Sequence, residues 1–261
     1  MNPLRCVSYL AADPGEPGLP AALFASIAAH LETSLKRSVS FRVGRCGSGP
    51  IASADDPFAR DEADLGWVCA PSMLWLVERG SVVFVPAAMT LDDPRYAGRP
   101  EYGSELVVRA GEVKSVEALR GAVAGYNDTA SLSGWGALLD RVQALGGLSF
   151  FAATVPTGSH ANSLRALREG RIDVAAIDTS VWRTADRTGL CSLEALGPYP
   201  IQPTVLRAGL AGELIESIAA ALLRLPPTPP LAGFVSASFQ AYVERTPWSV
   251  MWNASASATG G

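Results

Sequence analysis

One stretch of this chain places small hydroxyl groups where a predicted strand gives way to a predicted helix. In YNDTASLSGWGALL, residues 126–139, Ser131, Ser133 and Gly134 come just before an amphipathic helical pattern. The first N–H groups of a helix have no partner inside the helix, and the helix dipole adds partial positive charge there. Hydroxyl groups beside these donors, with a glycine that gives close access, are suited to binding an oxyanion.

A second stretch, TGSHANSLRALREG at residues 157–170, has the same plan, with Ser159 and His160 at the start of the helix. The alternative is ordinary capping, by Asp128 or Thr129 in the first stretch and by Ser159 in the second. Both helix starts follow successive strands of one predicted parallel sheet, so they meet at one edge. Ligands of open α/β sheets bind at that edge, which favours a site over capping alone.

Three ionisable residues are placed near this edge. His160 lies in a first helical turn, which disfavours a charged imidazolium, so we expect a neutral hydrogen-bond donor. A lone histidine is more often an ordinary surface or core residue. Asp178 ends the strand IDVAAID and could accept hydrogen bonds from a protonated ligand oxygen or a ligand amine, or simply cap the next helix. Tyr126 ends the neighbouring strand.

Catalytic and metal-binding motifs are missing from the sequence. It contains no G-x-S-x-G, no Walker loop, no G-x-G-x-x-G after a strand and no H-E-x-x-H. With two histidines and no C-x-x-C spacing among four cysteines, no zinc site is expected. Cys6 and Cys69 lie in or beside apolar strands and are expected to be buried thiols. No cofactor is expected, and a net charge of −4 argues against nucleic-acid binding.

The order of predicted elements indicates an α/β protein. Apolar runs typical of strands alternate with helical patterns of 10–15 residues, which predicts crossover units and largely parallel sheets. Two blocks follow: residues 1–104 together with 199–261 form a discontinuous first lobe, and residues 105–198 form the second. Residues 81–90 are expected to form one strand and residues 131–147 one helix.

No targeting or membrane segment is evident in the sequence. The N-terminus lacks a basic region followed by an apolar stretch, and no segment approaches about 18 consecutive apolar residues. As written, the chain is expected in the cytoplasm without membrane insertion. The periplasm or cell surface is expected instead if a leader has been removed from the sequence.

The two helix starts, together with Phe150-Phe151 and ADLGWVCAPS at residues 63–72, resemble the phosphate/phosphite/phosphonate-binding proteins of ABC importers. The resemblance implies a type-II periplasmic-binding-protein fold, in which two Rossmann-like lobes are joined by hinge strands and an anion is captured in an interlobe cleft. It also implies an ABC permease as partner. The ligand-binding residues it implies are Ser131, Leu132, Ser133, Gly134, Ser159, His160, Tyr126 and Asp178, with Tyr9, Pro71 and Ser72 closing from the other lobe.

The sequence departs from the family pattern at Leu132, where phosphonate binders commonly carry threonine. One hydroxyl donor is therefore lost, and a ligand other than a phosphonate, for example a carboxylate, stays open. The sequence predicts a solute-binding protein that performs no chemistry. Two alternatives are an enzyme of a cofactor-biosynthesis type on the same scaffold, with His160 as acid or base, and a ligand-sensing module.

Overall fold

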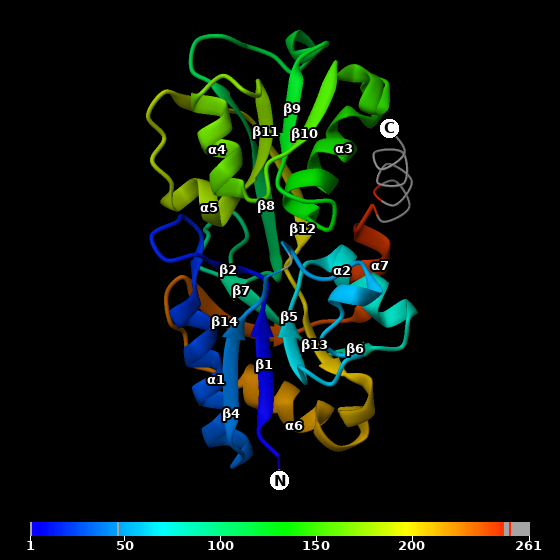
Figure 1. Ribbon diagram of the computed structural model, residues 1–261. Helices are drawn as coiled ribbons and strands as arrows, with labels where there is room; N and C mark the ends of the chain where they lie inside the picture. The colour runs from blue at the N-terminus through cyan, green and yellow to red at the C-terminus, as the bar shows by residue number, and fades with distance from the viewer. Residues whose placement is uncertain (1, 46, 248–250, 252–261) are drawn as a thin grey trace. The chain divides into compact units, whose positions relative to one another are not determined.

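The structure is a computed structural model that describes residues 2–45, 47–247 and 251 (Figure 1). The chain divides into two compact units. Unit 1 comprises the described residues of Met1–Gly15, Leu19–Tyr102 and Pro200–Arg245, and unit 2 those of Glu16–Gly18, Gly103–Tyr199 and Thr246–Gly261. The chain therefore passes from unit 1 to unit 2 within strand β8 (Glu101–Arg109) and returns within β12 (Leu190–Pro200).

Unit 1 is built on a five-stranded sheet with the order β4-β1-β5-β13-β6. The strands are β4 (Val39–Val43), β1 (Leu4–Ser8), β5 (Leu65–Trp67), β13 (Thr204–Arg207) and β6 (Val82–Phe84). β1 runs parallel to β4 and β5, whereas β13 runs antiparallel to β5 and β6.

The helices of unit 1 are α1 (Ala21–Leu35), α2 (Ala70–Glu78), α6 (Ala211–Leu223) and α7 (Phe239–Arg245). Leu23, Ile27 and Leu31 recur at helical spacing in α1, and all three are buried where α1 packs on β4 and α6. This is the amphipathic pattern that the sequence carries, and burial of its apolar stripe holds the helix on the sheet.

A buried carboxylate ties three strands of this sheet together. Asp64, which is 2% exposed, accepts hydrogen bonds from the guanidinium groups of Arg5 at 2.9 Å and Arg207 at 3.1 Å. Burial alone would raise the pKa of Asp64, but the hydrogen bonds from Arg5 and the charges of both arginines outweigh it, so the pKa is lowered. Asp64 is therefore ionised and held between β1 and β13.

Unit 2 is built on a second five-stranded sheet with the order β10-β9-β11-β8-β12. The strands not yet bounded are β10 (Ala153–Pro156), β9 (Val123–Tyr126) and β11 (Val174–Asp178). β10 and β11 both run parallel to β9, on either side of it, and β8 runs antiparallel to β11. The carboxyl ends of β9, β10 and β11 therefore lie at one edge of this sheet.

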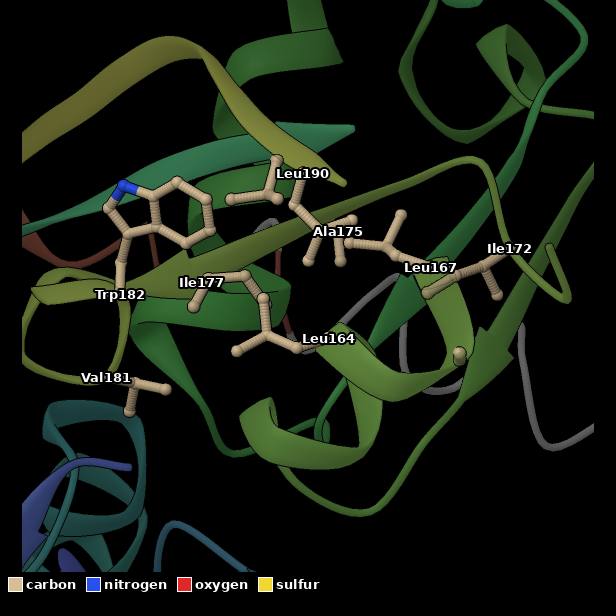
Figure 2. Close-up of a cluster of buried hydrophobic side chains, with 10 residues drawn as sticks. Leu164, Leu167, Ile172, Ala175, Ile177, Val181, Trp182 and Leu190 are labelled. Atoms are coloured by element: carbon tan, nitrogen blue, oxygen red, sulfur yellow. The ribbon is translucent and has the colours of Figure 1, made fainter. Parts of the chain in front are cut away.

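The helices of unit 2 begin at that edge. They are the π-helical turn η3 (Leu132–Gly136), α3 (Ala137–Val142), α4 (His160–Arg168) and α5 (Thr179–Thr184). Leu164 and Leu167 of α4 pack with Ala175 and Ile177 of β11 in one hydrophobic cluster (Figure 2). This packing fixes α4 on the sheet and so fixes the position of its first residue.

The remaining elements are short. β14 (Leu231–Ser236) pairs antiparallel with β7 (Ala87–Leu91), and β2 (Ala11–Ala12) pairs with β3 (Leu19–Pro20). Single 3₁₀ turns lie at Ser53–Asp55, Glu117–Leu119, Gln143–Leu145, Gly147–Phe150 and Ala208–Leu210.

Three expectations about the elements need correction. The predicted strand at 81–90 is two strands, β6 and β7, in different sheets, because Pro86 cannot donate a ladder hydrogen bond. The predicted helix at 131–147 is divided into η3, α3 and a 3₁₀ turn. Both sheets are mixed rather than largely parallel, because β8 and β13 do not follow a crossover helix and are free to run antiparallel.

The predicted first lobe ends with residues 199–261, and of these residues 248–250 and 252–261 lie outside the described part of the chain. Of the last residues that are described, Thr246, Pro247 and Met251 group with unit 2 instead of unit 1. The Met251 sulfur lies against Gly136 of unit 2. None of the helices in the described part of the chain has the length and apolar character needed to span a bilayer.

Candidate functional site

The site residues of unit 2 are brought together by the order of its strands. β9 ends at Tyr126, β10 at Pro156 and β11 at Asp178. Tyr126 and Pro156 are direct partners across the parallel ladder. The three segments that follow these strands therefore start side by side, which is the arrangement that the sequence predicted for the two hydroxyl-rich helix starts.

Ser131 caps the first of these segments. Its backbone is extended, with φ −81° and ψ 118°, and its Oγ accepts a hydrogen bond from the Gly134 N–H at 3.0 Å. The prediction that Asp128 or Thr129 would be the cap was wrong. Asp128 uses its carboxylate in a tight turn on the N–H of Ala130, at 2.9 Å, and so shapes the loop before the helix.

Gly134 is needed because another side chain occupies the space beside it. A β-carbon at this position would lie 1.8 Å from Oδ1 of Asn127, which is a buried residue. No side chain larger than hydrogen fits there unless Asn127 moves. Glycine thus lets the Asn127 amide lie directly against the turn, a contact that sequence reasoning missed.

The segment Leu132–Gly136 forms one wide turn, in which the N–H of Gly136 bonds the carbonyl of Ser131 at 3.0 Å. π turns are uncommon in proteins, and those that occur often lie at functional sites. Ser133 lies in this turn, and its carbonyl oxygen accepts a hydrogen bond from the buried Ser104 hydroxyl of β8 at 2.7 Å. Ser104 anchors the turn to the sheet and was also missed from sequence.

The central contact of the site joins the two helix starts. Ser133 Oγ lies 3.1 Å from Nε2 of His160, and Ser131 Oγ lies 3.5 Å from Ser133 Oγ. Two hydroxyl groups and an imidazole thus form a continuous polar row from η3 to α4. The structure confirms that these starts converge; that the row binds a ligand stays a prediction.

His160 is the ionisable group at the end of this row. Burial lowers the pKa of His160 below its usual 6.5, while the charge of Asp178 and the carbonyl of Ala176 act in the opposite direction. Its Nδ1 is buried. A neutral ring is therefore favoured near pH 7, in line with the sequence-based expectation.

Polar contacts hold the start of α4 in place. Ser159 is its cap, as predicted, and its Oγ accepts a hydrogen bond from the Asn162 N–H at 3.0 Å. Thr157 Oγ1 donates to the Tyr126 carbonyl at 3.0 Å and lies 2.6 Å from Ser163 Oγ. Thr157, which sequence reasoning passed over, thereby connects the end of β9 with the first turn of α4.

Asp178 and Tyr126 both have structural partners at this edge. Asp178 caps α5, because its Oδ1 accepts from the N–H and the hydroxyl of Ser180 at 2.8 and 2.7 Å. The capping role left open by the sequence is therefore shown, and its charge also acts on His160. The Tyr126 ring lies 4.3 Å from the ring of Trp135, and burial raises the pKa of its phenol.

Leu132 and the unit 1 candidates are also buried. The Leu132 side chain lies against Gly136. In unit 1, the Tyr9 ring lies so close to Gly44 that a β-carbon there would approach it to 2.4 Å. Pro71 opens α2, and the hydroxyl of the neighbouring Ser72 donates to the Pro50 carbonyl at 2.8 Å. Ligand contacts of these residues stay predictions.

The described part of the chain contains no group of three or more His, Cys, Asp or Glu placed to hold a metal ion. Cys6 and Cys69 are buried thiols, as predicted, whereas Cys46 lies outside the described residues. Burial raises the pKa of the Cys6 thiol to about 12, which disfavours the thiolate, the nucleophilic form.

Several solved structures share this fold. PhnD1 of Prochlorococcus marinus (MIT 9301), solved with methylphosphonate, superposes with a TM-score of 0.76 at 15% identity, over 97% of this chain and 98% of its own. A binding protein component of an ABC phosphonate transporter from Pseudomonas aeruginosa gives 0.72 at 16% identity, over 94% and 84%. A Xanthomonas citri protein bound to ATP gives 0.69 at 14% identity, over 98% of each chain.

At these identities the likeness shows the fold, an α/β architecture with two mixed five-stranded sheets as in type-II periplasmic binding proteins. No curated protein matches the sequence. The family model described as "ABC transporter, phosphonate, periplasmic substrate-binding protein" matches residues 18–243, which is most of the chain. That family consists of transporter binding components and not of enzymes, so the enzyme alternative has no support. The chain belongs to the family of periplasmic substrate-binding proteins of phosphonate ABC transporters.

Proposed function

We propose that this protein captures a phosphonate or a closely related small oxyanion at the carboxyl edge of the unit 2 sheet and delivers it to an ABC permease. The observation that carries this proposal is the 3.1 Å contact between Ser133 Oγ and His160 Nε2. It places a hydroxyl and an imidazole from two different helix starts within reach of one ligand oxygen.

The hydrogen-bonding state of the row supports an anionic ligand. Ser131 Oγ already accepts from the Gly134 N–H, so its own proton is available to a second acceptor. Ser133 likewise has one hydroxyl proton to donate. The first N–H groups of α4, at His160 and Ala161, point out of the helix start and have no partner within the helix. These donors together match the several oxygens of a phosphonate group.

The same residues set limits on the ligand. Leu132 contributes no hydroxyl, so the turn offers one donor fewer than the usual family pattern. Asp178 is ionisable and acts on His160, and a second negative charge beside it is unfavourable. A ligand oxygen that carries a proton, or an amine on the ligand, would turn this repulsion into a hydrogen bond. We therefore expect monoprotonated or amine-bearing phosphonates to bind better than fully ionised ones.

The family and one relative add weight to phosphonate over other anions. The Prochlorococcus marinus relative was solved with methylphosphonate, and its superposition on this protein covers 97% of this chain and 98% of that chain. Methylphosphonate is therefore the first probe to use. Its only substituent is a methyl group, which makes no hydrogen bonds, so binding reports on the oxyanion group.

A thermal-shift screen tests the proposal with methylphosphonate, an aminoalkylphosphonate, phosphite, phosphate and acetate. We expect stabilisation by phosphonates in the wild-type protein and its loss in Ser133→Ala and His160→Ala. The matched control is Ser217→Ala, which removes an exposed hydroxyl from α6 in unit 1 and should keep the full shift. Stabilisation by acetate alone, or an unchanged phosphonate shift in both site variants, would overturn this assignment.

A further inference from the structure

The contact between Ser133 and His160 raises the question of where the proton lies. A neutral imidazole has one N–H donor and one bare nitrogen acceptor, whereas an imidazolium has two donors. Nε2 shares a hydrogen bond with the Ser133 hydroxyl at 3.1 Å. With a neutral ring, Ser133 can donate to Nε2, and its proton is then directed away from an incoming anion.

Asp178 is the charged group that acts on His160. α4 packs on β11 and β9, and η3 packs on β11. β11 contributes Asp178, the end of β9 contributes the neutral Tyr126 phenol and the following Asp128, and η3 has no ionisable side chain. α4 carries two basic residues, Arg165 and Arg168, in its last turn. The Arg165 guanidinium reaches back to Asn162 Oδ1 at 2.8 Å and pairs with Glu16 at 3.3 Å. Neither guanidinium is among the groups that shift the pKa of His160.

A bound oxyanion would change this balance. An oxygen held by Ser133 would lie within hydrogen-bonding reach of His160, because the two side chains are already in contact. The negative charge of the ligand would add to that of Asp178, and both favour the charged form of the ring. In the empty site, the positive end of the α4 dipole disfavours an imidazolium at His160. The negative charge of the bound ligand would offset this effect.

We propose that His160 takes up a proton when the oxyanion binds, so that an imidazolium donates from Nε2 to the ligand and releases the Ser133 hydroxyl to donate as well. The proton comes from solvent, and no covalent bond other than N–H is formed. This inference rests on the proposed function and adds that the site is a proton-coupled anion receptor.

The sign of the pH dependence follows from this coupling. Below the pKa of His160 in the empty protein, the ring is charged in both states and affinity is insensitive to pH. Between that pKa and the higher pKa in the complex, affinity falls by up to about tenfold per pH unit as pH rises. Above the higher value the ring is neutral in both states, and the contribution of His160 to the pH dependence ends.

Nitrogen NMR of the imidazole rings tests the proposal directly, because ¹⁵N shifts distinguish the neutral ring from the charged one. The chain has two histidines, and the signals that vanish in His160→Gln identify His160. We expect His160 to be neutral in the empty protein near neutral pH and charged with saturating methylphosphonate. His30, whose Nε2 contacts the Ala221 carbonyl at 2.9 Å in unit 1, should not change and serves as internal control.

Titration calorimetry in two buffers of different ionisation enthalpy gives an independent count of the protons taken up when the ligand binds. At a pH at which methylphosphonate is already monoprotonated in solution, we expect uptake of a fraction approaching about one proton per ligand in wild type and in His30→Gln, and none on the residual binding by His160→Gln. A ring that is neutral in the complex, or already charged without ligand, overturns the inference even though methylphosphonate binds. Uptake that persists in His160→Gln also overturns it and assigns the proton to the ligand or to Asp178. If the wild-type protein shows neither binding heat nor a thermal shift with methylphosphonate, the proposed function is overturned, and this inference with it.

Discussion

Ser133 Oγ and His160 Nε2 lie 3.1 Å apart although the two residues are 27 positions apart in the chain. Each side chain starts a different helical segment, and each segment follows a different strand of one sheet. The contact exists because β10 pairs with β9 in parallel, which aligns Pro156 with Tyr126 and brings the following loops together. Its consequences can be tested residue by residue.

Replacing Ser133 by alanine should weaken methylphosphonate binding by roughly tenfold to a hundredfold, because a hydrogen bond to a charged group contributes about 1.5–3 kcal/mol. The unfolding temperature without ligand should fall less than the affinity does, because the Ser133 carbonyl, which anchors the turn to Ser104, is kept and only the hydroxyl contact with His160 is lost. Titration calorimetry measures the affinity, with Ser217→Ala as control. An affinity within twofold of wild type would remove Ser133 from the site.

Replacing Gly134 by alanine should destabilise the protein, because the new methyl group would meet Oδ1 of Asn127 at 1.8 Å. Overpacking of this kind costs about 1–3 kcal/mol of the free energy of unfolding. The matched control is Gly212→Ala in α6, where no atom lies within 4 Å of an added β-carbon. That change should stabilise by about 0.5–1 kcal/mol, since alanine is the better helix former.

Urea unfolding of both variants measures the difference. The same free energy change in Gly134→Ala and Gly212→Ala would show that the close approach of Asn127 does not constrain the turn. Relief of the Gly134→Ala defect by a second change, Asn127→Ala, would localise the conflict to this pair.

Replacing Asp64 by asparagine should lower the free energy of unfolding by about 3 kcal/mol near neutral pH, because two guanidinium groups lose their common buried partner. Their own exposure, 37% for Arg5 and 27% for Arg207, keeps the effect at the lower end of the range for buried pairs. Chemical unfolding of wild type and variant gives the value, with Glu216→Gln on the exposed face of α6 as control.

The same carboxylate predicts a pH dependence. The pKa of Asp64 is lowered from 3.8, so its contribution is complete above that value and is lost as pH falls through the lower pKa of the folded state. Wild type should therefore lose stability in acid more steeply than Asp64→Asn. Parallel stability curves for the two proteins below pH 4 would contradict the role assigned to this group.

Cys6 should resist alkylation in the folded protein. Its pKa of about 12 lies well above the ordinary 9.0, which lowers the thiolate fraction near neutral pH by roughly a thousandfold. Cys191, which is only half-buried, provides the comparison. Peptide mapping after timed treatment with iodoacetamide should show Cys191 modified first and Cys6 modified only in denaturant. Equal rates in the native protein would contradict the buried, protonated thiol.

The sequence by itself determined the features that depend on near neighbours. The strand-then-hydroxyl pattern predicted that α4 begins after Ser159. The alternation of strands and helices predicted the α/β class, and the two helix starts carried the family resemblance. These signals are local, because capping and amphipathicity act over three or four residues.

Only the tertiary structure decided which residues meet across the chain. The cap at Ser131 and the wide turn after it depend on Asp128 using its carboxylate on Ala130 and on Ser104 holding the turn from another strand. The antiparallel courses of β8 and β13 follow from chain connections that have no local signal. Strand order placed His160 against Ser133 and Asp178 within its electrostatic reach. Long-range pairing sets these contacts, and neither spacing nor residue type in one stretch encodes them.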